Sequence, residues 1–175
     1  MRAEIGLICL LTLSAPVWAE KADRDKPVNI EANTLHVDDA KKVAVYEGNV
    51  ILTQGTLTIT ADRIEVRQDD QGFSSGDADG KPAYFRQKMD PKPGETDPNG
   101  VYAEGWADHI EYDGRNDKVR LINHARLKRG EEELRGSLII YDGSTEYYQA
   151  QGSLSGTPGR VRAVIRPKNN TKPKP

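Results

Sequence analysis

Apolar and polar residues alternate along most of this chain, and short turns separate the alternating segments. Every second position is apolar from Val43 to Val45, from Val119 to Leu121 and from Val161 to Ile165, as in strands that bury one face. Stretches such as TQGT and KRGEE lie between these segments and favour tight turns. Windows of about eleven residues carry no apolar stripe of helical period. The pattern therefore predicts an all-β chain.

One short phrase recurs four times, as IEANTLHVD from Ile30, ITADRIEV from Ile59, EGWADHIEYD from Glu104 and LRGSLIIYD from Leu134. A small residue stands at the same place in each copy: Ala32, Ala61, Ala107 and Gly136. A step of 29 residues separates the first two and also the last two, with a gap of 46 between the pairs. Repeats of this period are typical of stacked strand units.

The apolar positions change parity inside each copy of the phrase. Ile59 and Ala61 share one face of a strand, whereas Ile64 and Val66 have the other parity. Such a strand needs a bulge or a corner, because a one-residue slip otherwise turns its apolar side chains outward. We expect each repeated strand to turn the same corner beside its small residue.

The first 19 residues have the layout of a secretory signal, with an apolar run from Ile5 to Leu13 and a cleavage pattern that ends at Ala19. That run is too short to span a bilayer, and no later segment is apolar for long enough. Cys9, the single cysteine of the sequence, lies inside the signal. The mature chain, expected to begin at Glu20, therefore has no thiol and no disulfide.

The remainder is expected to hold one domain. Residues 20–26 are predicted to be a linker, 27–167 a β domain, and 168–175 a disordered, proline-rich tail. Inside the domain, residues 68–100 are rich in Gly, Asp, Pro and Lys. We predict a loop-rich insertion there, with one strand that starts at Pro82.

Composition and charge exclude some classes of protein. The chain has 175 residues, of which 36% are hydrophobic and 30% charged, so one domain with a thin core is expected rather than a large enzyme. The formal net charge is −2 with both signs intermixed. Charge therefore gives no reason to expect a nucleic acid as partner.

Residues that could carry chemistry are better explained by structure. Ser74 lies in GFSSG, which fits the G-x-S-x-G pattern of hydrolases, but no helix pattern follows to form the nucleophile elbow. His36, His109 and His124 lie far apart without cysteines, so we assign no metal and no cofactor. Several aspartates recur beside turns and corners, where the carboxylate bonds local backbone amides: Asp38, Asp62, Asp108, Asp113 and Asp142.

The densest basic run leaves two interpretations open. It is either a solvated strand face or a rim that contacts phosphates of an anionic lipid or glycolipid. Three glutamates follow it directly. Its members are Arg115, Lys118, Arg120, Arg126, Lys128 and Arg129.

The phrases IEANTLHVD, YEGNVILTQGTLTITADRIEV, GKPAYFRQ, AEGWADHIEYD and GRVRAVIRPK, in this order after a signal peptide, resemble the OstA-like family of periplasmic lipopolysaccharide-transport proteins. The resemblance extends from Lys26 to Lys168, and EGNV followed by TQGTLTITAD is its most specific part. It implies a twisted, partly open antiparallel β-jellyroll of two sheets in a V, built from repeated strand units. It also implies a slot that holds the acyl chains of lipopolysaccharide, and head-to-tail stacking into a bridge across the periplasm.

Apolar residues of inward parity are the candidate lipid contacts, although simple core packing explains most of them equally well. Phe85 and Tyr112 are preferred, because they are large and lie near the insertion or a turn. The twelve candidates are Val28, Ile30, Leu35, Val37, Leu52, Ile64, Phe85, Ile110, Tyr112, Leu121, Leu127 and Ile139.

The first and last strands, residues 27–37 and 160–166, are expected to leave backbone groups unpaired at the two edges of the stack. Such edges can add to another OstA-like domain, either a second copy or a domain of the inner-membrane and outer-membrane transport components. We thus expect a periplasmic carrier and bridge for lipopolysaccharide. The alternatives are a structural β-solenoid adaptor that assembles without lipid, and a periplasmic hydrolase that uses Ser74.

Overall fold

The computed structural model describes residues 23, 26–89, 101–145, 147–153 and 159–165. The expected signal peptide, its cleavage site and the tail from 168 lie outside the described residues. The described part is all β, as predicted, and its strands form one antiparallel sheet that does not close. They are β1 (Asn29–Glu31), β2 (Thr34–Asp38), β3 (Val43–Gln54), β4 (Leu57–Asp69), β5 (Gly72–Lys88), β6 (Tyr102–Asp113), β7 (Lys118–Arg129), β8 (Glu132–Asp142), β9 (Tyr147–Gln151) and β10 (Arg162–Val164).

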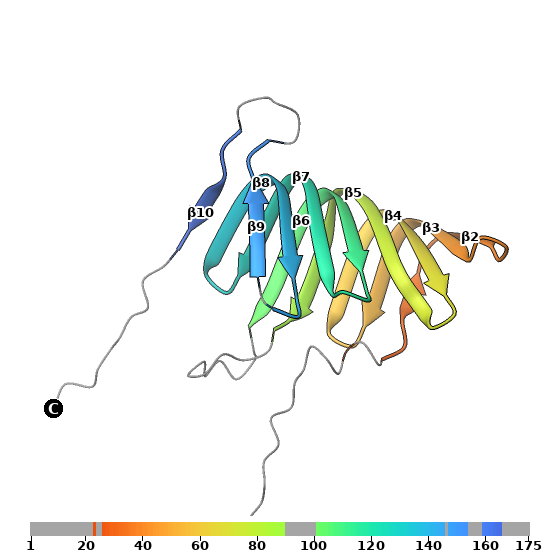
Figure 1. Ribbon diagram of the computed structural model, residues 1–175. Coiled ribbons are helices and arrows are strands. Elements are labelled where there is room, and N and C mark those ends of the chain that lie inside the picture. Colours follow the sequence, from red (N-terminus) through yellow and green to blue (C-terminus); the bar gives the residue numbers. More distant parts are fainter. Residues whose placement is uncertain (1–22, 24–25, 90–100, 146, 154–158, 166–175) are drawn as a thin grey trace, which may run out of the picture.

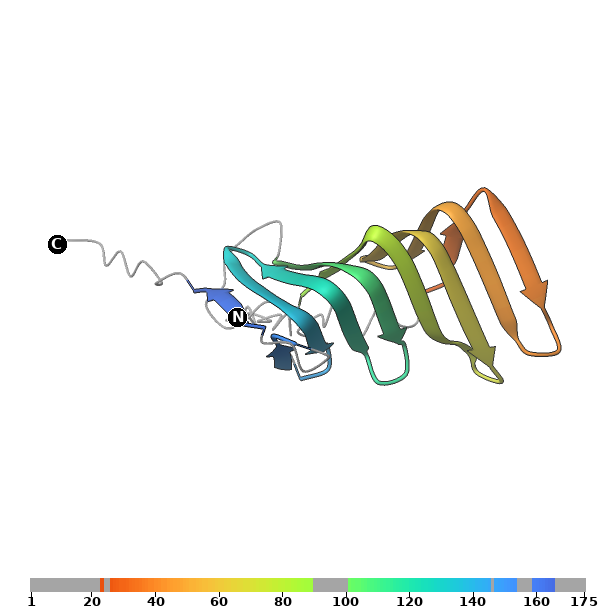
Figure 2. The same cartoon turned by 90° about the horizontal axis from the view of Figure 1, so that it is seen from above.

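The strands stack in sequence order from β3 to β8, so each is joined to the next by a turn (Figure 1). Viewed from above, these turns form a regular row along the molecule (Figure 2). β1 and β2 both pair with β3 at one end of the stack, and β9 and β10 both pair with β8 at the other. Each end of the stack is thus one further level, here called an end rung, that consists of two short strands instead of one long strand.

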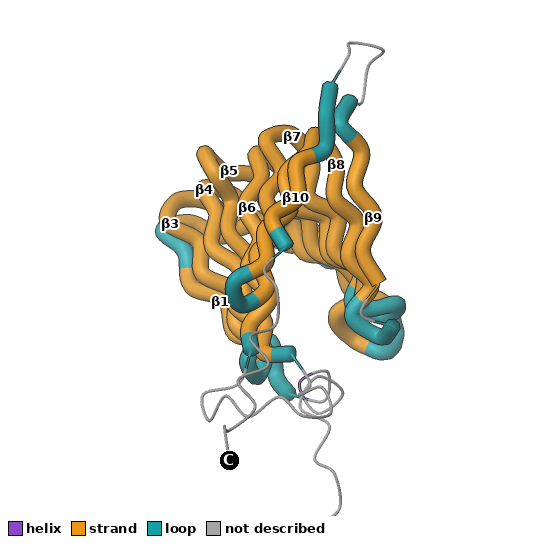
Figure 3. The backbone as a smooth tube through the Cα atoms, turned by 90° about the vertical axis from the view of Figure 1, so that its left-hand side faces the viewer, coloured by secondary structure: helices purple, strands orange, loops and turns teal. Residues whose placement is uncertain are grey.

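Every long strand bends near its middle, and the bends line up. The pairing register shifts between Thr60 and Arg63 in β4, and between Trp106 and His109 in β6. The predicted corner beside Ala61 and Ala107 is therefore confirmed. Figure 3 looks along the stack and shows the bent strands as an arch that is open on one side.

Unusual backbone angles make these corners possible. In β3 the corner contains Gly48 with φ +81°, a conformation that side chains with a Cβ adopt at a cost. The backbone amide of Asn33, between β1 and β2, donates to the carbonyl oxygens of Glu47 and Gly48 at 3.1 and 3.0 Å. In β7 the corner residues Asn123 and His124 have φ of 61° and 51°.

The corners divide the sheet into two arms. Arm I consists of β2, β9 and the segments 43–47, 63–67, 75–79, 109–113, 118–122 and 138–142. Arm II consists of β1, β10 and the segments 50–54, 57–60, 83–88, 102–107, 125–129 and 132–136. The apolar core lies between the two arms, which face each other across the arch.

The structure corrects the predicted insertion. Residues 72–88 are not loop-rich but form β5, the longest strand, which pairs with β4 on one side and β6 on the other. Glycine and aspartate disfavour strands intrinsically, yet the two neighbouring ladders hold this segment extended. Gly76 and Ala78 face the interior there and are buried. Residues 90–100 lie outside the described part.

Candidate functional site

Two unbroken rows of apolar residues line the inside of the arch from one end to the other. Each row follows paired positions from strand to strand, so its members lie side by side across the sheet. In arm I the row is Leu35, Tyr46, Ile64, Ala78, Ile110, Leu121, Ile139 and Ala150. In arm II it is Ile30, Leu52, Ile59, Phe85, Gly105, Leu127, Leu134 and Ala163.

All twelve candidate lipid contacts lie on this inner side, but their exposure differs. Those in the middle of the stack, such as Phe85 and Ile110, are fully buried. Val28 and Ile30 are half-buried against the core. Leu35 and Val37, on β2 at the open end, are 51% and 59% exposed. Contact of any of the twelve with lipid stays a prediction.

The middle of the interior is filled by side chains from both arms. Phe85, Leu121 and Ile139 have no exposed surface. Gly105 makes room for this packing, because a Cβ there would lie 2.9 Å from a methyl of Leu121 and 3.2 Å from the ring of Phe85. In this conformation the exposed apolar surface on the inner side of the arch therefore lies at the two ends of the stack.

At the β8 end, an apolar pocket of about 80 Å³ opens between the arms. Tyr141 closes one side, and its hydroxyl donates to Sδ of Met89 at 3.1 Å. Arg129 and Glu132 lie at the β7–β8 turn beside the pocket. The sequence indicated the alternation of the residues from Val161 to Ile165 but did not assign those of the pocket to a site. The remaining lining residues are Ala103, Leu127, Glu133, Leu134, Tyr148, Ala163, Val164 and Ile165.

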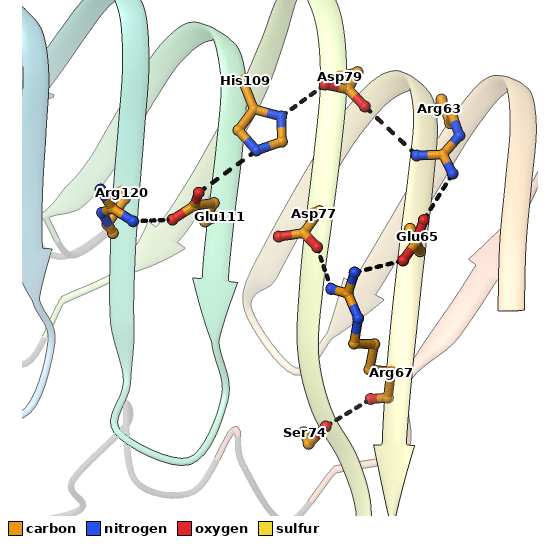
Figure 4. A network of polar contacts seen from close by, with 9 residues as sticks. All are labelled: Arg63, Glu65, Arg67, Ser74, Asp77, Asp79, His109, Glu111 and Arg120. Atoms are coloured by element: carbon orange, nitrogen blue, oxygen red, sulfur yellow. Dashed lines mark hydrogen bonds and ion pairs between the residues drawn. The ribbon is translucent and has the colours of Figure 1, made fainter. Parts of the chain in front are cut away.

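The outer side of arm I carries a network of charged side chains (Figure 4). Arg63 donates to Glu65 at 2.8 Å and lies 3.6 Å from Asp79. His109 Nδ1 lies 2.6 Å from Asp79 Oδ1, and Nε2 lies 3.8 Å from Glu111. The hydrogen bond from Arg63 lowers the pKa of Glu65, despite partial desolvation that opposes it. This network fastens neighbouring strands on the outside and leaves the interior apolar.

The histidines do not converge on one site. His36 is exposed on β2 at the end of the stack, and His124 Nδ1 lies 2.8 Å from Asp108 on the neighbouring strand. Among the described residues, no group of three histidine, cysteine or acidic side chains is placed to hold a metal ion.

The serine and the aspartates mostly have structural partners. Ser74 lies within β5 rather than on an elbow, and its hydroxyl donates to the carbonyl oxygen of Arg67 at 2.9 Å. Asp38, Asp113 and Asp142 accept hydrogen bonds from backbone amides of their own turns. The hydroxyl of Ser144 donates to Asp142 and lowers the pKa of that carboxyl. Asp62 and Asp108 line a hollow at the outer corner.

The basic run is largely engaged in ion pairs. Arg115 contacts Asp69, Lys118 lies 3.7 Å from Asp142, and Arg120 contacts Glu111. Arg126 donates to Glu133 at 2.7 Å. Most of the run thus fits the solvated strand face, whereas Arg126 and Lys128 lie on the outer side of arm II, apart from the network of Figure 4.

Within the described residues, no helix is long and apolar enough to cross a membrane.

Comparison with known proteins places these features in a family. Residues 29–147 match a family model described as LptA/(LptD N-terminal domain) LPS transport protein. The lipopolysaccharide export system protein LptA of Escherichia coli K12 is 34% identical over 160 residues, which cover 90% of this chain and 80% of that protein. LptH of Pseudomonas aeruginosa, also described as a lipopolysaccharide export system protein, is 31% identical over 160 residues, which cover 89% of this chain and 87% of LptH.

A solved structure shows the same fold. The crystal structure of LptH from P. aeruginosa, described as the LptA-homologous periplasmic component of the lipopolysaccharide transport device, superimposes with a TM-score of 0.72 at 31% identity. The superposition covers 83% of this chain and 99% of that one. Family match, sequence identity and the open antiparallel arch agree, and this chain belongs to the LptA/LptD N-terminal domain family of lipopolysaccharide transport proteins.

Proposed function

We propose that this chain acts in the periplasm as a carrier that shelters the acyl chains of lipopolysaccharide between its two arms, and that copies joined head to tail extend this interior from the inner to the outer membrane. The observation that carries the proposal is the pair of unbroken apolar rows that end at two open rungs. Burial of one methylene group contributes about 0.8 kcal/mol, so apolar surface alone can hold a lipid without covalent chemistry.

The packing of the interior argues that one copy does not enclose a whole acyl chain. Phe85, Leu121 and Ile139 fill the middle and have no exposed surface, and the end pocket opens at the β8 end of the stack. A whole acyl chain therefore needs either spread arms or a second copy that adds its own apolar end. Leu35 and Val37 supply such an end on β2, because they continue the inner row of arm I and are half exposed.

Strand direction favours head-to-tail stacking. β1 and β2 run from arm II to arm I, antiparallel to β3, whereas β9 and β10 run from arm I to arm II, antiparallel to β8. When two copies stack in the same orientation, β2 therefore meets β9 antiparallel, and β1 meets β10 antiparallel. The ladder continues without reversal, and such a heterologous contact generates an open filament.

The same edges suit other members of the family. An OstA-like domain of the inner-membrane component would join one end of the filament, and the N-terminal domain of the outer-membrane component would join the other. Both contacts would use strand addition, in which the backbone supplies most of the hydrogen bonds.

Native mass spectrometry of the mature chain with lipopolysaccharide tests the carrier function. We expect one or more lipids retained per chain, and complexes whose copy number grows with protein concentration. A spectrum of bare chains at micromolar protein and excess lipid would contradict the proposal.

Cross-linking tests the polarity of the stack. His36 on β2 and Gln149 on β9 are exposed on the outer side of arm I, and the expected mature chain has no cysteine. A His36→Cys variant mixed with a Gln149→Cys variant should give cross-linked pairs with a short bismaleimide. Each variant alone should stay uncross-linked, whereas pairs formed by His36→Cys alone would indicate a two-fold symmetric dimer instead.

One observation favours the second candidate function, a structural adaptor that assembles without lipid. Phe85, Ile110, Leu121 and Ile139 leave no free surface in the middle of the interior. An adaptor predicts filaments that form equally well without lipid and no lipid in the native spectrum. The same measurement therefore separates the two candidates.

A further inference from the structure

The outer sides of the two arms differ in charge. From β5 to β10, the outer side of arm II carries six cations and two carboxylates: Arg86, Lys88, Arg126, Lys128, Arg135 and Arg162, against Glu104 and Glu133. From β3 to β8, the outer side of arm I carries seven carboxylates and four cations: Glu47, Glu65, Asp77, Asp79, Glu111, Asp113 and Asp142, against Arg63, Arg67, Lys118 and Arg120. An anion is therefore attracted to arm II rather than to arm I.

The outer cations of arm II form a continuous line with an aromatic pair. Tyr84, Trp106, Arg126, Arg135 and Arg162 occupy paired positions on successive strands from β5 to β10. Three arginines thus follow two aromatic rings on one side of the sheet. We call these five residues, together with Lys128 from the adjacent row, the outer arm II patch.

The aromatic end of the patch is a rigid apolar platform. The rings of Tyr84 and Trp106 lie 5.2 Å apart between centroids, and the guanidinium of Arg126 lies 4.7 Å from the centroid of Trp106. The hydroxyl of Tyr84 donates to Glu104 at 2.7 Å. Burial and this bond raise the pKa of Tyr84 to about 12, so the hydroxyl stays protonated at neutral pH. Both side chains are only partly buried, so the apolar C–H groups of a pyranose ring can pack against them.

The cationic end is held in place by one carboxylate. Arg126 donates to Glu133 at 2.7 Å, and Arg135 also donates to Glu133. One negative charge thus orients two guanidinium groups. Lys128 lies at the position paired with Glu133, and Arg162 lies at the position paired with Arg135. The group of four cations keeps a positive excess over this carboxylate. Arginine forks of this kind suit phosphate oxygens.

The patch lies on the far side of a wall from the apolar end pocket. Glu133 and Val164 line the inner pocket, and they also line an outer hollow with Lys128, Gly130, Glu131 and Arg135. The β7–β8 turn connects the two sides, since Arg129 and Glu132 border the inner pocket while Gly130 and Glu131 border the outer hollow. A ligand with an apolar part and an anionic part can therefore reach around this turn and contact both sides of the wall.

We propose that the outer arm II patch binds the phosphorylated saccharide head of a glycolipid whose acyl chains enter the apolar pocket on the inner side of the same wall. The inference rests on the proposed carrier function and adds to it a site for the head. Phosphate groups contact Arg126, Arg135, Arg162 and Lys128, and a sugar ring packs against the partly exposed side chains of Trp106 and Tyr84.

Tryptophan fluorescence tests this site directly, because Trp18 falls in the expected signal and Trp106 is then the single tryptophan of the mature chain. The probe is lipopolysaccharide stripped of all acyl chains with its phosphates retained. We expect a saturable change in Trp106 emission that weakens as salt concentration rises. The affinity should fall about tenfold in Arg135→Gln and in Arg162→Gln, since hydrogen bonds to charged groups are typically worth at least that factor.

The matched control is Arg67→Gln, which removes an arginine from the outer side of arm I and should leave the affinity unchanged. A silent Trp106, an equal response to the dephosphorylated head, or an equal loss in Arg67→Gln would overturn the inference. Binding of the chain to vesicles of anionic phospholipid without a response to the stripped head would overturn it too, and would assign the patch to a membrane surface.

The two proposals fail separately. Intact lipopolysaccharide retained in the native spectrum, with no response to the stripped head, leaves the carrier function standing and removes the outer site. A response to the stripped head, with no retention of intact lipid, supports the outer site and removes the interior slot.

Discussion

Leu35 and Val37 allow the proposed lipid path to be tested without disturbing the core. They lie on the inner side of β2 and are 51% and 59% exposed. Full burial of such a side chain contributes about 1.5–3 kcal/mol, so about half of this, near 1 kcal/mol each, remains for a ligand to gain. Replacing both, as Leu35→Asn with Val37→Thr, should cost about 2 kcal/mol of binding, or about 30-fold in affinity.

Titration of lipopolysaccharide against the mature chain, read by native mass spectrometry at a concentration where sedimentation shows single chains, measures this change. The buried half of each side chain also contributes to folding, so the unfolding temperature should fall modestly, and the titration is made at a temperature where both proteins are fully folded. Ile51→Asn is the matched control, since Ile51 is 41% exposed on the outer side of β3. An unchanged affinity in the double variant, or an equal loss in Ile51→Asn, would refute the assignment of these residues to the lipid path.

The remaining predictions concern stability and are checked by urea or thermal unfolding. Gly48→Ala should lower the free energy of unfolding by at least about 1–2 kcal/mol, because φ is +81° and the new Cβ would lie 2.6 Å from Asn33 Nδ2. The control Gly76→Ala should leave that free energy unchanged, since its new Cβ would have nothing closer than 3.7 Å. Equal losses in the two variants would contradict the role of Gly48 at the corner. Phe85→Ala should lose about 3–5 kcal/mol, since Phe85 is fully buried, and a loss below about 1 kcal/mol would show that the interior is not packed. The pKa of Glu65 is lowered below 4.5 by Arg63, so its contribution to stability is complete above the unfolded pKa and is lost as the pH falls through the folded one. When the pH is lowered from about 7 to about 3, the free energy of unfolding of Glu65→Gln should therefore fall by roughly 0.5 kcal/mol less than that of the wild type. Identical dependence of the two free energies on pH would contradict this.

Local pattern was sufficient to predict the repeated corner. The change of parity between Ala61 and Ile64 required a bulge, and the register shifts between Thr60 and Arg63. The same reasoning holds for β6, where Ala107 lies at the shift. Parity works here because one side of each strand is buried, so a slip of one residue would expose the whole set.

Local pattern failed where neighbouring strands outweigh intrinsic preference. The Gly- and Asp-rich start of β5 reads as a loop, yet ladders to β4 and β6 keep it extended. Its inward positions hold Gly76 and Ala78, and both are buried. A single sequence carries no direct signal of those flanking ladders.

Parity in the sequence predicted which side of the sheet each candidate residue faces, but not how exposed its side chain is. Parity placed Phe85 and Leu35 on the same inner side, whereas only the order of the stack shows that Phe85 is buried in the middle and Leu35 is exposed at an end. For this reason a charge at Phe85 tests folding, and a charge at Ile30 or Leu35 tests lipid binding. The basic run already offered Arg126 and Lys128 as possible phosphate contacts, but it did not connect them with Trp106, Arg135 and Arg162, because these three residues come from other strands.

A photoreactive residue on the inner side of an open end reports whether acyl chains enter the arch. We would place a photo-cross-linking amino acid at Leu35 in one variant and at Ile51 in another, and irradiate each with lipopolysaccharide. We expect a covalent lipid adduct from position 35, inside the arch, and none from position 51, outside it. Equal adducts from both positions, or an adduct from position 51 alone, would contradict the claim that the interior of the arch carries the acyl chains.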